Sequence, residues 1–112
     1  MLGIENIISM YDEEIDVKLI KTKPLKPDPN RKGLWDPGEY TINIYLPNIE
    51  SKKDFHLTLI HEFLHAKREI LYGNGGKEED IYFLEEYNYE RNPELVDFII
   101  DFYKLEVPKE FQ

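Results

Sequence analysis

The chain of 112 residues contains no cysteine. Disulfide bonds and thiolate zinc sites are therefore excluded, and any zinc ion would be held by histidine, glutamate or aspartate. Basic residues are few, 14 against 23 acidic ones, which gives a formal net charge of −9 at pH 7. This charge argues against nucleic acid and anionic membranes as partners, because both are bound through basic surfaces.

Long apolar runs are missing as well. No stretch approaches the roughly 20 apolar residues of a membrane span. The first residues have neither the basic start nor the apolar run of a signal peptide. We therefore expect a soluble, cytoplasmic protein. The length suits one domain over residues 1–112, in which the 41% of hydrophobic residues form a single modest core.

Hydrophobic periodicity predicts the order of the secondary structure elements. The last predicted helix is apolar around much of its circumference and must therefore be buried against something. Ser51 or Asp54 could cap the helix that follows the second strand. The expected elements are a helix over 3–12, a strand over 15–21, an irregular loop over 22–38, a strand over 39–46, and helices from 51 or 54 to about 71, over 77–91 and over 93–105.

The second strand is a candidate for substrate binding. Its residues Tyr40, Thr41, Ile42, Asn43 and Ile44 alternate in polarity and are rich in β-forming side chains. A sheet of few strands has open edges, and an edge strand beside a cleft can pair with an extended peptide through main-chain hydrogen bonds. An ordinary place within the sheet is the simpler interpretation, and the two are compatible.

Residues 61–65 read His-Glu-Phe-Leu-His. On a helix, His61 and His65 lie one above the other on the same face and can bind one ion. Zinc accepts imidazole ligands, and a catalytic site leaves one position open for water. Glu62 would lie beside the metal and could take a proton from that water. The simpler alternative is a core helix with two buried histidines.

Two histidines alone do not hold a catalytic zinc ion. His56 lies five residues before His61 and points about 140° away around the helix, so it is expected to pack or cap rather than to bind the same ion. The third ligand should be a carboxylate on the helix that returns past the metal. The candidates are Glu85, Glu86 and Glu90.

These motifs and their order resemble the gluzincin metallopeptidases, above all the minigluzincins, whose fold is similar to the catalytic domains of CAAX prenyl proteases and β-lactam-sensor peptidases. The resemblance spans most of the chain. It implies an α+β, zincin-like domain with a small sheet and one zinc ion per chain.

In that group the glutamate ligand is commonly followed four residues later by an acid that orients a zinc-binding histidine. The stretch Glu86-Tyr87-Asn88-Tyr89-Glu90 fits this pattern. The resemblance thus implies Glu86 as the ligand and Glu90 as the orienting acid, although aspartate is usual at the latter position. Glu85 is the alternative ligand.

We therefore expect a zinc-dependent endopeptidase acting on peptide or protein substrates. The resemblance also implies latency, in which the segment of about residues 93–112 covers the cleft or is exchanged between the chains of a homodimer. An oxyanion stabiliser is needed, and the sequence offers Tyr72, Tyr82, Tyr87 and Tyr89 without favouring one. The competing interpretation is a zinc-binding interaction module without peptidase activity. Two histidines and a carboxylate also suit iron(II).

Overall fold

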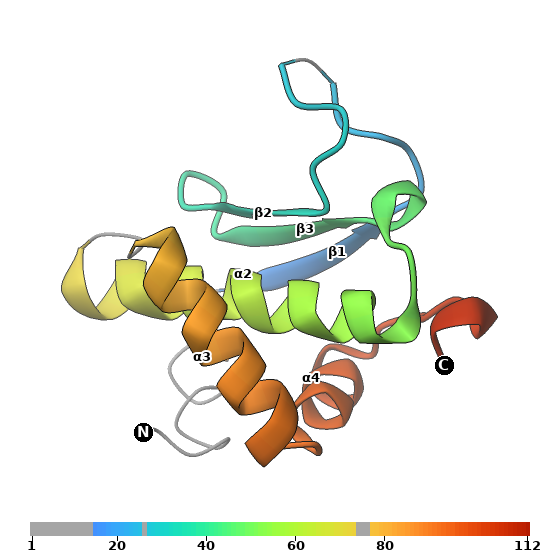
Figure 1. The fold of residues 1–112 in the computed structure, drawn as a ribbon. Helices are drawn as coiled ribbons and strands as arrows, with labels where there is room; N and C mark the ends of the chain where they lie inside the picture. The colour runs from blue at the N-terminus through green and yellow to red at the C-terminus, as the bar shows by residue number, and fades with distance from the viewer. Residues whose placement is uncertain (1–14, 26, 74–76) are drawn as a thin grey trace.

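The structure is a computed structural model that describes residues 15–25, 27–73 and 77–112, with the backbone alone at 71 and 72. Within these residues the chain forms a three-stranded sheet and three α-helices (Figure 1). The prediction of an α+β fold is confirmed. The helix predicted over residues 3–12 lies outside the described residues.

The sheet has the strand order β1-β3-β2. Strand β1 (Asp16–Ile20) pairs in parallel with β3 (Thr41–Tyr45), and β2 (Gly33–Asp36) pairs with β3 in antiparallel orientation. Successive side chains alternate between the two faces, so Ile42 and Ile44 of the central strand share one face, and both are fully buried in the core.

Two predictions about the sheet are wrong. Strand β2 falls inside the loop predicted over 22–38. The sequence does not predict it, because four residues that start at a glycine and end before a proline are too few to show an alternation of polar and apolar side chains. The strand predicted to form the substrate-binding edge, with Tyr40 to Ile44, is instead hydrogen-bonded on both sides. Strand β2 therefore forms the edge that the prediction assigned to β3.

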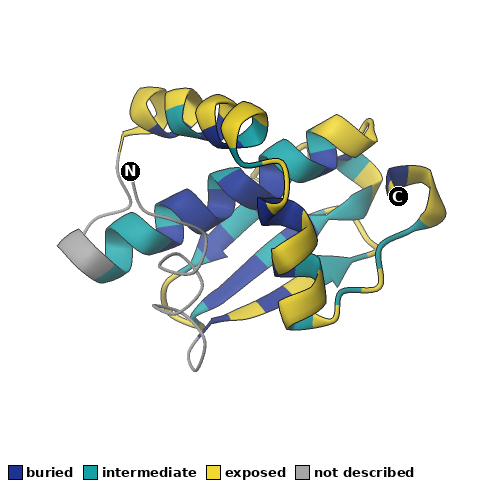
Figure 2. Ribbon diagram, turned by 90° about the horizontal axis from the view of Figure 1, so that it is seen from below, coloured by how far each residue is buried: buried dark blue, intermediate teal, exposed yellow. Residues whose placement is uncertain are grey.

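Helix α2 (Lys52–Tyr72) is the element on which the other parts pack. Its N-cap is Ser51, whose hydroxyl accepts a hydrogen bond from the backbone N–H of Asp54, and its C-cap is Gly73 in the left-handed conformation at φ 77°. Both ends therefore carry standard capping signals. Phe55, Leu59 and Ala66 are fully buried, since α2 lies between the sheet and α4 (Figure 1, Figure 2).

Two helices and a short tail complete the chain. Helix α3 (Glu78–Arg91) crosses α2, and α4 (Leu95–Tyr103) buries Leu95, Val96 and Ile99. In the tail, η2 (Lys109–Phe111) places the Phe111 ring on that of Phe55, with centroids 5.8 Å apart and planes at 11°. The other short turn is η1 (Leu46–Asn48). In the described part of the chain, no helix combines the length and apolar character needed to cross a membrane.

Candidate metal centre

The HExxH stretch of α2 opens onto a cleft of about 800 Å³. Strand β2 and residues of the preceding loop form one wall, and the first half of α3 forms the other. His61, Glu62 and His65 all line this cleft. The helix thus presents the whole predicted motif to one open space.

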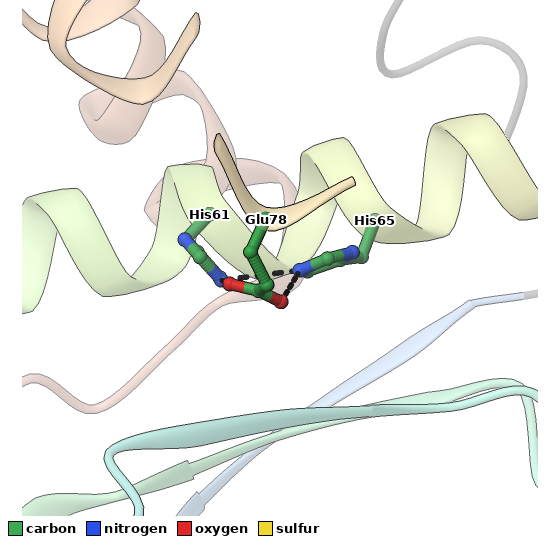
Figure 3. Close-up of side chains that lie close together, drawn as sticks. All are labelled: His61, His65 and Glu78. Carbon is green, nitrogen blue, oxygen red and sulfur yellow. Dashed lines mark hydrogen bonds and ion pairs between the residues drawn. The ribbon is translucent and has the colours of Figure 1, made fainter. Parts of the chain in front are cut away.

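The two histidines converge on one point. Their Nε2 atoms lie 3.1 Å apart, and Glu78, the first residue of α3, reaches between them (Figure 3). Its carboxylate oxygens are 2.7 Å from His65 Nε2 and 3.3 Å from His61 Nε2. One ligand atom from each of the three residues lies within 4.8 Å of the others.

This group fits a zinc ion in both chemistry and spacing. Two imidazole nitrogens and one carboxylate oxygen form a known catalytic zinc set. Ligand atoms about 2.0–2.1 Å from a tetrahedral ion lie roughly 3.3–3.4 Å from one another, close to the separations of 2.7 to 3.3 Å between these atoms. Small side-chain adjustments would therefore place all three on one ion.

The Glu85 carboxylate contacts the Nδ1 side of the His61 ring. Its Oε1 lies 3.3 Å from His61 Nδ1, and the side chain is buried. A carboxylate at Nδ1 fixes the imidazole tautomer and leaves Nε2 free for a metal. Burial lowers the pKa of His61, but the hydrogen bond with Glu85 and the charges of Glu62, Glu85 and Glu78 outweigh burial and raise it overall.

Glu62 is a buried carboxylate beside this group, with 7% of its surface exposed. Burial raises its pKa, while His61, His65 and a hydrogen bond from the Trp35 backbone N–H partly oppose that rise. A carboxylate with a raised pKa binds a proton more readily near neutral pH, as a general base requires.

The predicted third ligand and its partner lie elsewhere. Glu86 lines the cleft but is exposed and outside the group formed with the histidines. Glu90 is exposed and is not among the described residues of the cleft wall. Glu85 makes the contact with His61 expected of Glu90, and Glu78 makes the contact with both histidines expected of Glu86. Glu86 as a zinc ligand stays a prediction that metal analysis can test.

The candidates predicted from the sequence, Glu85, Glu86 and Glu90, lie in the second half of α3, and Glu78 at its start is not among them. The start of α3 lies beside the histidines, because the Glu78 carboxylate contacts the Nε2 atoms of both. Glu78 and Glu85 are seven residues apart, or two helical turns, and so share one face of α3. This spacing indicates a shared face of α3, but not which neighbour that face contacts.

The candidate tyrosines lie in different environments in the structure. Tyr82 lines the cleft, with its ring centroid 5.1 Å from that of His61. Tyr87 packs with Phe83, and Tyr89 packs with His56, whose predicted packing role this contact agrees with. The side chain of Tyr72 lies outside the described residues.

The described cleft lining comes from residues between Asp28 and Glu86. The segment 93–112 therefore contributes nothing to it. Among known proteins, no family model, curated protein or solved structure matches this chain. The resemblance to minigluzincins accordingly stays a prediction.

Proposed function

We propose that the protein is a zinc-dependent metallopeptidase that hydrolyses peptide bonds. One observation carries the proposal: two imidazole nitrogens 3.1 Å apart face an open cleft beside the buried carboxylate of Glu62. A helix that merely packed two histidines would have no need to direct both rings at one point next to a buried acid.

His61, His65 and Glu78 would hold the ion. Bound there, zinc would supply Lewis-acid activation of a water molecule and of the scissile carbonyl. Glu85 would keep the Nδ1–H of His61 engaged and so direct Nε2 inward.

Glu62 would act as the proton carrier. Its raised pKa favours uptake of the proton released as water attacks, and the same carboxyl group can then give that proton to the leaving amine. Because Glu62 is buried next to the histidines, little bulk water competes for this transfer.

The peptide substrate would bind along the edge of β2 as an additional strand of the sheet. The backbone N–H of Tyr45 donates to the carbonyl of Lys32, so in this register the N–H and C=O groups of Gly33 and Trp35 point away from β3. The Trp35 N–H is bonded to Glu62. The outward groups of Gly33 and the carbonyl of Trp35 are placed to pair with an extended peptide.

Tyr82 is our candidate for stabilising the oxyanion. Its ring lies against His61, and 57% of its surface is exposed to the cleft and solvent. A phenol hydroxyl can donate a hydrogen bond to the negative oxygen that develops during attack on the carbonyl.

The latent form implied by the resemblance is a separate proposal. Residues 93–112 pack on α2 away from the cleft, and Leu95, Val96 and Ile99 are buried there. To cover the cleft of their own chain, these residues would have to leave that position. Exchange of this segment between two chains would instead produce a homodimer, which size-exclusion chromatography with light scattering detects.

Glu62→Gln tests the proposed activity. We expect hydrolysis of an unstructured protein substrate to fall by about 10²–10⁴-fold, with zinc content unchanged, because the amide cannot carry the proton. Glu50→Gln, at an exposed position, is the matched control and should retain activity. Zinc-loaded wild type without any hydrolysis would instead support the non-catalytic zinc-binding module.

A further inference from the structure

We propose that Gly33 is a positioning residue that keeps the Glu62 carboxylate in its working orientation, an inference that rests on the proposed peptidase function. Gly33 belongs to β2, and its backbone lies directly against the Glu62 side chain. The absence of a side chain at this position leaves the space that Glu62 occupies.

The contact is too close for any other residue. A Cβ atom at Gly33 would lie 2.9 Å from Glu62 Cγ, 2.9 Å from Thr58 Cγ2 and 3.2 Å from Glu62 Oε2. Separations under about 3.0 Å are well inside the optimal carbon contact of roughly 3.5–4.0 Å. A methyl group would therefore force one of these neighbours to move.

Both neighbours are held in place. Thr58 is buried, and its hydroxyl donates to the carbonyl oxygen of Asp54 at 2.8 Å, one turn earlier in α2. Glu62 is buried and accepts the hydrogen bond from the Trp35 N–H. The Thr58 methyl group belongs to a β-branched side chain with restricted χ1, so the longer Glu62 side chain is the one that would shift.

Backbone conformation does not account for a glycine here. Among the described glycines, positive φ occurs at Gly73 alone, and Gly33 lies in a regular strand. Glycine inside a strand is unfavourable and usually marks a close approach of another group. At Gly33 that group is the proposed general base.

Two contacts from β2 thus define the Glu62 position. The open space at Gly33 sets how near the side chain comes to the strand, and the Trp35 N–H interacts with the carboxylate and favours its charged form. The edge strand that would bind the peptide therefore also places the base that acts on it. Displacement by about 1 Å can cost on the order of 10²-fold in rate.

The test is Gly33→Ala in the full-length protein, with Gly38→Ala as the matched control. A Cβ at Gly38 meets only Asp36 Oδ1 at 3.3 Å, and Gly38 is exposed and outside the described cleft lining. We expect Gly33→Ala to lower kcat by about 10²-fold with KM and zinc content near wild type. Gly38→Ala should leave all three unchanged.

A second readout needs neither metal nor activity. In the metal-free protein, the amide proton of Trp35 should resonate downfield because it is bonded to a carboxylate. Gly33→Ala should move this resonance upfield, and Gly38→Ala should not. Wild-type kcat together with an unmoved Trp35 resonance in Gly33→Ala would overturn the inference.

Failure to fold does not remove the test. If Gly33→Ala is unfolded, Gly33→Ala combined with Thr58→Ala removes the Thr58 contact and leaves Glu62 as the group that must shift. The Trp35 resonance is then compared with that of Thr58→Ala alone. If wild-type protein hydrolyses nothing, the proposed function fails, whereas the Trp35 shift still decides whether Gly33 positions Glu62.

Discussion

At the scale of single residues, burial makes Glu62 both a suitable base and a cost to the metal-free fold. Its pKa is raised from 4.5 by burial, and that of His61 is raised from 6.5 by Glu85 and the neighbouring acids. Both groups bind protons more tightly in the folded state than in the unfolded state. The free energy of unfolding should therefore fall as the pH rises above the ordinary pKa of each group, 4.5 for Glu62 and 6.5 for His61, and through its raised value in the folded state.

Glu62→Gln should flatten this dependence. Without a carboxylate to ionise, the metal-free variant avoids the loss that begins above the ordinary pKa of 4.5. We expect a higher Tm than wild type near pH 7 and a similar Tm near pH 4, measured by circular dichroism. Glu86→Gln, at an exposed position, should follow the wild type. A Glu62→Gln curve parallel to the wild-type curve would contradict the burial argument.

Tyr82 provides a second prediction at this scale. Tyr82→Phe keeps the ring that packs on His61 and removes only the hydroxyl. We expect kcat to fall by about 10²–10³-fold, with zinc content unchanged. Tyr87→Phe is the control, since that ring packs with Phe83. Equal rates for the two variants would assign oxyanion stabilisation to another group.

At the scale of elements, helices α2 and α3 could be predicted from local signals. Ser51 and Gly73 cap the two ends of α2, and Asn92 is the C-cap residue of α3, and these end signals need no distant contact. Strand β2 could not be predicted in this way, because Gly33–Asp36 becomes a strand through its pairing with β3 and not through its own sequence pattern. The order of strands likewise depends on pairing partners, so the edge was assigned to the wrong strand.

The residues of the candidate metal centre also differ in whether the sequence predicts them. His61, Glu62 and His65 follow from helical spacing within one element. The pairing of Glu78 and Glu85 with His61 depends on how α3 crosses α2, which the spacing inside either helix does not encode. Local spacing therefore predicts that the side chains of the HExxH motif lie together, whereas their carboxylate partners depend on the packing of α3 on α2.

Helix α4 and the tail provide a prediction about an element. Leu95, Val96 and Ile99 are almost fully buried. Burial of each is worth about 1.5–3 kcal/mol, so their joint loss is comparable to the whole stability of a small domain, about 5–15 kcal/mol. Deletion of residues 93–112 should abolish cooperative thermal unfolding. A folded, zinc-binding fragment more active than the full chain would instead demonstrate latency.

At the scale of the whole molecule, the candidate metal centre joins elements that are distant in sequence. His61 and His65 come from α2, Glu78 begins α3, and β2 covers Glu62. A bound ion would therefore link α2 to α3 and stabilise the domain, because metal that binds only the folded state raises its stability. The acidic chain, with a net charge of −9, also attracts a divalent cation.

The most direct measurement is the metal content of purified protein by elemental analysis, on wild type, Glu78→Ala, Glu85→Ala and Glu86→Ala side by side. We expect about one zinc per wild-type chain, loss of zinc in Glu78→Ala, weakened binding in Glu85→Ala and no change in Glu86→Ala. Loss in Glu86→Ala with retention in Glu78→Ala would contradict the ligand set. Absence of zinc from the wild type, even after zinc is added back, would contradict the metal centre itself.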